Sequence, residues 1–106
     1  MEIAANLPVL FSERAIQDLD DIANYIAEQG YPDTALFYTD RIYAFCQTLC
    51  QFPGKYKTCK RKGYKRYNYR CAFFEKTYTI AYRIEKNQTL VIKRIIHGKR
   101  LGMLSN

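Results

Sequence analysis

The chain of 106 residues contains only one histidine, His97, and none of the motifs that most often mark an enzyme. It lacks the GxxxxGK[ST] loop that binds phosphates, the GxSxG nucleophile turn and the HExxH zinc helix. No apolar run approaches the ~18 residues of a membrane-spanning helix, and no secretory leader pattern opens the sequence. These absences predict a cytoplasmic protein that does not contact a membrane, with few residues to carry chemistry.

The four cysteines lack the paired spacing that is typical of a structural zinc site. Cys46 and Cys50 are four residues apart on an expected helix, but no histidine or further cysteine clusters with them. We therefore expect no metal site and no cofactor. Without a secretory leader, the sequence predicts that Cys46, Cys50, Cys59 and Cys71 are reduced thiols that pack as small apolar side chains. A nucleophilic pair of a cysteine with His97 is conceivable, but the apolar surroundings of the cysteines favour packing.

Acidic side chains are almost absent from the second half of the chain. Residues 1–54 carry two basic and eight acidic side chains, whereas residues 55–106 carry fifteen basic and two acidic ones. The halves thus have net charges of −6 and +13, and eight Lys or Arg residues lie between Lys55 and Arg70 without one acid. This asymmetry predicts an acidic partner such as nucleic acid, the ribosome or an acidic peptide. A solvated face that only aids solubility is the alternative.

The basic residues that we expect to contact such a partner lie in this segment and near the end of the chain. They are Lys60, Arg61, Lys62, Lys65, Arg66, Arg70, Arg94, Lys99 and Arg100. An RNA-cleaving site is the one chemistry that these residues could support, since arginines stabilise phosphate charge and a histidine can move the proton of a 2′-hydroxyl. The sequence does not show whether they converge.

The first half has the apolar spacing of two helices after a short strand at 9–12. Ser12 is expected to cap the first helix, whose polar face would carry Asp18, Asp20 and Asp21 in solvent. Its apolar stripe repeats at intervals of three and four: Ala15, Ile16, Leu19, Ile22, Ala23 and Ile26.

The second helix is expected to begin after Gly30 and Pro32, with Asp33 as its cap, and to end at Pro53-Gly54. Its stripe is Ala35, Tyr38, Ile42, Phe45, Leu49 and Phe52. The short connection predicts an antiparallel helical hairpin.

Strand patterning follows at 65–74, 77–84 and 89–96, joined by two hairpin connections, with the last strand predicted to be central. The expected fold class is α+β in the order β-α-α-β-β-β, with the helical hairpin packed on one face of a small, mainly antiparallel sheet. We expect a single domain over residues 1–106, with its core at about 9–100.

The string AIQDLDDIANYIAEQG, followed by ALFYTDRIYAF and LCQFPG, resembles the helical hairpin of ParE toxins in the RelE/ParE superfamily. YRCAFFEKTYTIAYRI is similar to the paired strands of that family, and LVIKRIIHGKR to its last strand. The resemblance covers about residues 9–100. It implies the β-α-α-β-β-β fold and the toxin of a type II toxin–antitoxin system, with a cognate antitoxin as its partner in a hetero-oligomer.

The superfamily contains ribosome-dependent mRNA endonucleases of the RelE kind and DNA gyrase poisons of the ParE kind, which have no nuclease site. Here a RelE-like site would use Arg70, His97 and Arg100. Its third-strand arginine is replaced at about Thr79, and its late tyrosine has no counterpart. The resemblance therefore favours a gyrase inhibitor without catalytic residues, in which His97 only packs and hydrogen-bonds at a strand end. The endonuclease, and a remnant that binds an antitoxin without being toxic, remain the alternatives.

Overall fold

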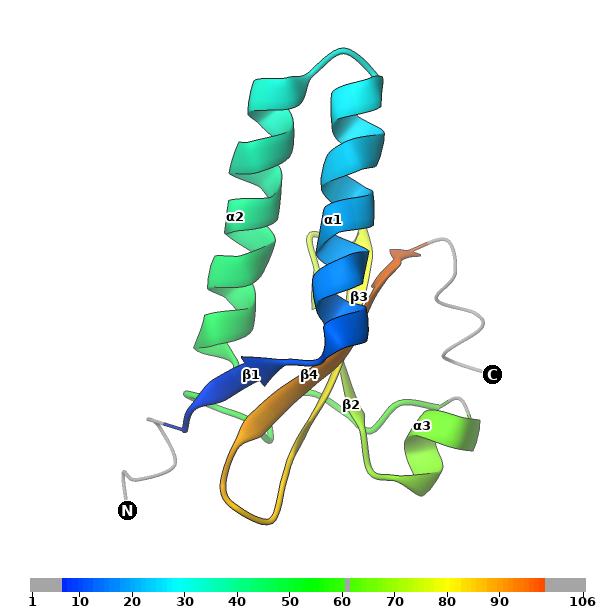
Figure 1. The fold of residues 1–106 in the computed structure, drawn as a ribbon. Coiled ribbons are helices and arrows are strands. Elements are labelled where there is room, and N and C mark those ends of the chain that lie inside the picture. The colour runs from blue at the N-terminus through cyan, green and yellow to red at the C-terminus, as the bar shows by residue number, and fades with distance from the viewer. Residues whose placement is uncertain (1–6, 61, 99–106) are drawn as a thin grey trace.

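The computed structural model describes residues 7–60 and 62–98, in which two long antiparallel helices stand against a four-stranded sheet (Figure 1). The predicted order of strand, helix, helix, strand, strand and strand is confirmed, with one short helix added before the second strand. Within these residues no helix is both long and apolar enough to cross a membrane.

The chain enters through β1 (Val9–Phe11) and continues directly into α1 (Glu13–Glu28). The predicted cap is confirmed, because the Ser12 hydroxyl accepts a hydrogen bond from the amide of Ala15 at 3.0 Å. The same hydroxyl donates to the carbonyl of Lys93 in the last strand at 2.9 Å. One side chain thus both starts α1 and fixes its position on the sheet.

The apolar stripe of α1 is only partly as predicted. Ala15 and Ile22 are buried in the core, but Ile16 is 51% exposed. The predicted solvent position of Asp18 is wrong, because its carboxylate turns towards the sheet and the residue is only 5% exposed. A buried charge requires partners, and Asp18 finds them on the last strand, as described below.

The connection to α2 (Pro32–Thr48) turns at Gly30, whose φ of +97° favours glycine. Pro32 opens α2 in its first turn, where a missing amide costs nothing. The predicted cap at Asp33 is wrong. Tyr31 holds the cap position without a side-chain hydrogen bond, while Asp33 lies in the first turn, where its charge suits the helix dipole.

The second helix is shorter than predicted and ends at Thr48 rather than at Pro53-Gly54. Leu49 is still buried at its end, but Phe52 is 71% exposed and not part of the apolar stripe. The turns that follow Thr48 carry the chain away from the helix axis, which breaks the spacing on which the prediction rested.

The sheet has the order β1-β4-β3-β2, formed with β2 (Arg70–Phe74), β3 (Tyr78–Ile84) and β4 (Leu90–His97). β1 runs parallel to β4 and the other neighbours are antiparallel, so the predicted mainly antiparallel sheet is confirmed. The predicted central position of β4 is confirmed as well. The register between β3 and β4 shifts at Ala81/Tyr82.

The predicted strand over 65–74 is wrong in its first half, where α3 (Lys62–Arg66) forms instead. The Asn68 amide donates to the carbonyl of Lys65 at 3.0 Å, and the Tyr69 amide donates to that of Tyr64 at 2.9 Å. Asn68 has a φ of +61°, which turns the chain into β2. The alternation of tyrosines in this segment is typical of a strand, but only the residues from Arg70 onwards pair with β3.

The two faces of the sheet are covered differently. The hairpin face holds the main core, in which Ile80, Tyr82, Leu90 and Ile92 are completely buried. A smaller cluster of Cys59, Cys71, Ala81 and Ile96 is covered by Tyr64 and Tyr69 of the α3 segment. This second face carries the basic segment.

Candidate functional site

The basic segment predicted to contact a target runs from the end of α2 through α3 into β2. Lys60, Lys62, Lys65 and Arg66 are exposed there, and Arg70 is half-buried at the start of β2. No acid shares this stretch of sequence, so its positive charges have no neutralising neighbour along the chain. Three further predicted contact residues, Arg61, Lys99 and Arg100, lie outside the described residues.

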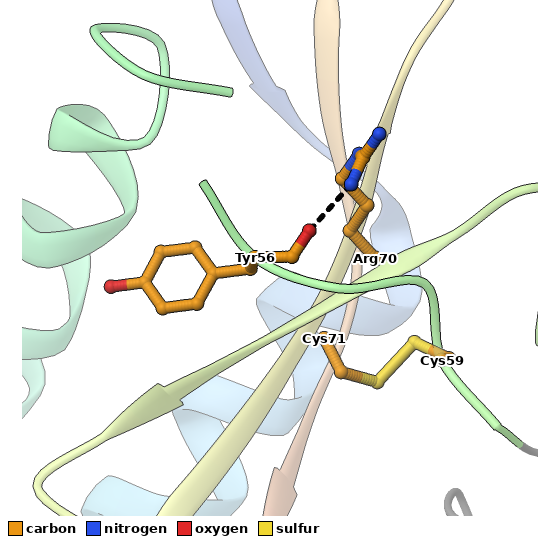
Figure 2. The surroundings of a disulfide bond; sticks show 4 residues. All are labelled: Tyr56, Cys59, Arg70 and Cys71. Carbon is orange, nitrogen blue, oxygen red and sulfur yellow. Dashed lines mark hydrogen bonds between the residues drawn. A yellow bond between two sulfur atoms is a disulfide. The ribbon is translucent and has the colours of Figure 1, made fainter. Parts of the chain in front are cut away.

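A disulfide between Cys59 and Cys71 joins the two ends of this segment, with their Cα atoms 5.1 Å apart (Figure 2). The prediction of reduced thiols is therefore wrong for this pair. Their amides donate to the carbonyls of Tyr69 and Lys57, at 2.8 and 3.1 Å, so a short antiparallel pairing brings the sulfurs together. The cysteines are twelve positions apart in sequence, and that spacing does not reveal the pairing.

Cys46 and Cys50 are not part of a disulfide, as predicted. Cys46 is completely buried, and burial raises its pKa from 9.0 to about 12, so it is not a nucleophile at neutral pH. Among the residues that the structure describes, no three His, Cys, Asp or Glu side chains gather to hold a metal ion.

Arg70, at the start of β2, turns its guanidinium towards the segment that follows α2 (Figure 2). Its Nη1 donates to the carbonyl of Tyr56 at 2.5 Å, which fastens the segment after α2 to the sheet (Figure 2). On β3 its partner is Tyr82, at the end of the sheet remote from His97. The guanidinium therefore has a structural contact in addition to any contact with a target.

Arg94 is held by Asp18 in a two-pronged ion pair. Its Nε and Nη2 donate to the two carboxylate oxygens of Asp18 at 2.9 and 3.2 Å. This pairing, together with the nearby Tyr64, raises the pKa of Arg94 above its ordinary value. Only 21% of the Arg94 side chain is exposed, so this predicted contact residue is less open to a target than the exposed cations of α3.

His97 ends β4 with an exposed side chain, and its ring meets the edge of the Tyr78 ring at a centroid distance of 5.3 Å. It lines a cavity of about 510 Å³ between α1 and β4, together with Tyr25, Tyr78 and Arg94 among others. After it, the amide of Gly98 donates to the carbonyl of Thr77. A Cβ at Gly98 would stand 2.5 Å from that oxygen, so only glycine fits there.

Two of the three residues predicted for an RNA-cleaving site are described, and the sheet does not bring them together. Arg70 pairs with Tyr82, and His97 pairs with Tyr78. These positions lie four residues apart on β3, or about 13 Å along the strand, and on its two opposite neighbours. Thr79, where the resemblance placed the missing arginine, is completely buried, and its hydroxyl has no hydrogen-bond partner among the described residues.

Sequence reasoning missed two features of this surface. One is Asp18, which looked like part of a solvated helix face. The other is the set of tyrosines in the α3 segment, Tyr64, Tyr67 and Tyr69, which lie beside its cations. The alternation of tyrosines with Lys and Arg in GYKRYNYR was the signal that could have identified them.

Comparison with known proteins relates residues 9–102 to one family, described as the ParE toxin of the type II toxin–antitoxin system parDE. Among solved structures, a chain from "Chromosomal ParDE TA system from P. aeruginosa" is similar, with a TM-score of 0.74 at 20% sequence identity. The match covers 86% of this chain and 95% of that chain. At such an identity the likeness concerns the fold. No curated protein matches the sequence.

Proposed function

Because the chain belongs to the ParE toxin family and is thus the toxin component of a type II toxin–antitoxin system, we propose that it acts by binding DNA gyrase. In this proposal the bound toxin stabilises the complex of gyrase with cleaved DNA and cuts no nucleic acid itself. Its partner is an antitoxin, as membership of a toxin–antitoxin system implies.

The observation that carries this proposal is the separation of Arg70 from His97 across the sheet. Cleavage of RNA requires a proton carrier and a charge stabiliser within hydrogen-bonding reach of the same phosphate. The register supports the absence of such a site, because the partners of Arg70 and His97 lie four residues apart on β3. The burial of Thr79 supports the same conclusion, since no substrate can reach its hydroxyl.

The target-binding surface that we propose is centred on α3. Lys60, Lys62, Lys65 and Arg66 are exposed on one stretch that the Cys59–Cys71 disulfide holds to the sheet. We also include Arg61, Lys99 and Arg100 in this surface, but only on the basis of the sequence, because they lie outside the described residues. Arg70 and Arg94 enter it as residues that position this surface, because their guanidinium groups already bind Tyr56 and Asp18.

We further propose that the antitoxin offers an acidic segment to this basic surface and apolar side chains to the helical hairpin. On α2, Leu36 and Phe37 are 66% and 71% exposed, which gives such a segment an apolar anchor. The affinity of the complex should fall as salt is added and then level off where apolar burial dominates. An affinity that does not change between low and moderate salt contradicts this arrangement.

The function is tested by inducing the toxin without its antitoxin while a DNA-damage reporter and cellular mRNA are followed together. We expect the reporter to rise while mRNA stays intact. The variant with Lys65→Glu and Arg66→Glu should weaken the response, because these side chains are exposed and their change alters charge rather than packing. Lys76→Glu, an exposed charge reversal on the β2–β3 turn, is the matched control and should leave the response unchanged. Early mRNA cleavage without DNA damage contradicts the proposal and favours the endonuclease.

A further inference from the structure

The α3 helix lies away from the α1–α2 hairpin (Figure 1), over the second face of the sheet. A groove lies beside it. It is a cavity of about 450 Å³, within the range of small-ligand sites. Its lining consists of Gly63, Tyr64, Tyr67, Tyr69, Arg83 and Lys93. We call this cavity the tyrosine groove.

A second cavity of about 700 Å³ adjoins the tyrosine groove, since Tyr67 and Arg83 line both. The second cavity adds Arg70, Lys86 and the carboxylate of Glu85. The two adjoining cavities form a track whose lining has four positively charged side chains and one negatively charged one. Such a track suits a polyanion that extends over more than one unit, because a single small anion would occupy only part of it.

Arg83 fixes the position of the exposed tyrosine between the two cavities. Its Nε donates to Glu85 at 2.8 Å, and its Nη1 donates to the carbonyl of Tyr67 at 2.9 Å. Its guanidinium carbon lies 4.8 Å from the centre of the Tyr69 ring. With its backbone held in this way, Tyr67 keeps a side chain that is 55% exposed at the junction of the cavities.

The wall of the tyrosine groove is also held in place. The Tyr64 and Tyr69 rings meet edge to face at a centroid distance of 5.7 Å, over the cluster that contains the Cys59–Cys71 disulfide. The exposed cations Lys62, Lys65 and Arg66 stand on the same short helix as Tyr64. Aromatic faces and positive charges are thus presented side by side on a constrained loop.

We propose that the tyrosine groove binds a single-stranded nucleic-acid segment, with a base stacked on Tyr67 and neighbouring phosphates paired with Lys93 and the cations of α3. Stacking on aromatic side chains combined with a basic track is the usual way in which proteins hold unpaired nucleotides. A duplex keeps its base faces stacked inside the helix and offers only phosphates. An acidic peptide would match the charge but would leave the exposed tyrosine ring without a flat partner.

This inference goes beyond binding to gyrase, because it gives the toxin a nucleic-acid contact of its own. It is tested with the purified full-length toxin and fluorescently labelled oligothymidine of about 12 nucleotides, a length within the usual site size of such tracks. The expected result is tighter binding of the single strand than of a duplex of equal length. The logarithm of the affinity should fall with the logarithm of the salt concentration, by about 0.7 for each phosphate contact.

Substitutions at the groove separate stacking from charge. Tyr67→Ala should weaken binding of the single strand by about tenfold or more, and Tyr67→Phe, which keeps the ring, should restore most of it. Lys93→Gln should reduce the slope of the logarithm of the affinity against the logarithm of the salt concentration by about 0.7. Tyr31→Ala is the matched control, since Tyr31 is 61% exposed but lies in the turn of the hairpin, and it should change nothing.

Three results overturn the inference: equal affinity for single strand and duplex, an unchanged affinity after Tyr67→Ala, or displacement of the oligonucleotide by polyglutamate at equal charge concentration. The last of these would assign the groove to an acidic protein segment. Gyrase poisoning is measured separately on the same proteins. If the unsubstituted toxin poisons gyrase but does not bind the oligonucleotide, only this inference fails, whereas binding of the strand without any effect on gyrase would remove only the proposed function.

Discussion

The carboxylate of Asp18 accepts a hydrogen bond at the edge of β4 that lacks a paired strand, and an ion pair with Arg94 holds it there. β1 pairs with β4 only as far as Ile92, and within residues 7–60 and 62–98 no other strand pairs with the following residues of β4 on that side. The Asp18 carboxylate takes the place of a strand there. It accepts hydrogen bonds from the amide of Ile95 at 2.8 Å and from the Nε of Arg94 at 2.9 Å. A helix side chain thus protects an edge that could otherwise pair with another chain.

The first prediction concerns this contact. Asp18→Ala should lower the free energy of unfolding by about 3 kcal/mol, because it leaves the partly buried Arg94 without its partner and the Ile95 amide unsatisfied. Asp20→Ala, an exposed change on the same helix, should cost about 0.5 kcal/mol or less. Denaturant unfolding of both variants measures the difference. Equal stability of the two variants would contradict the role assigned to Asp18.

The second prediction concerns the disulfide. Reduction of the Cys59–Cys71 bond should lower the free energy of unfolding by about 3 kcal/mol, since the bond closes a loop of about a dozen residues. The double variant Cys59→Ser with Cys71→Ser should not respond to the reductant. Alkylation of the denatured, unreduced protein should label only Cys46 and Cys50, as read by mass spectrometry. Labelling of all four cysteines without reductant would show that the bond does not form.

The third prediction concerns alkaline pH. Burial raises the pKa of Tyr82 from 10.0 to about 12, and its hydroxyl donates to the carbonyl of Pro53 at 2.7 Å. The unfolded chain loses this proton first. The stability due to neutral Tyr82 is therefore fully present below about pH 10 and is lost as the pH rises to about 12.

The loss should amount to about 2–3 kcal/mol over that window. Tyr82→Phe should be less stable at neutral pH by about 1 kcal/mol but should fall less steeply above pH 10. Cys46, whose raised pKa acts in the same direction, accounts for a residual slope in both proteins. Identical slopes in unfolding experiments from pH 9 to 12 would show that Tyr82 does not carry the effect.

The fourth prediction concerns His97. His97→Gln removes the ring contact with Tyr78 and should cost about 0.5–1.5 kcal/mol of stability, with toxicity preserved. If the imidazole moved protons in an RNA-cleaving reaction, the same change would remove a ~10²–10⁴-fold contribution to the rate. Cell killing after induction, compared at equal protein levels, separates the two. A folded His97→Gln protein that no longer kills cells would favour the endonuclease function instead.

The order of the elements could be predicted because each has an apolar period that depends only on nearby residues. The residues at which the helices and strands begin and end were harder to predict. Asp33 looked like a cap and Phe52 like part of a stripe, but the turns around Tyr31 and after Thr48 depend on how the helices meet the sheet. The first half of the strand predicted at 65–74 is not a strand, and part of it belongs to α3. The turn at Asn68 that separates α3 from β2 is not evident from the spacing of the tyrosines.

The candidate site was harder to predict because it depends on contacts between distant residues. Asp18 and Arg94 are 76 positions apart, and an acid on a helix normally indicates a solvated face. The distance between Arg70 and His97 depends on the register of three strands, including the shift at Ala81/Tyr82. The sequence supplied the residue types and the charge asymmetry of this surface, but their arrangement followed only from the sheet.

The proposal that this toxin poisons gyrase is tested most directly with purified components. Gyrase and supercoiled plasmid are incubated with the toxin, and the covalent complexes are released with detergent and protease to count linearised DNA. The account predicts that linear DNA accumulates with toxin concentration and that the prebound antitoxin prevents it. Unchanged gyrase cleavage, together with cutting of mRNA on purified ribosomes, would contradict it.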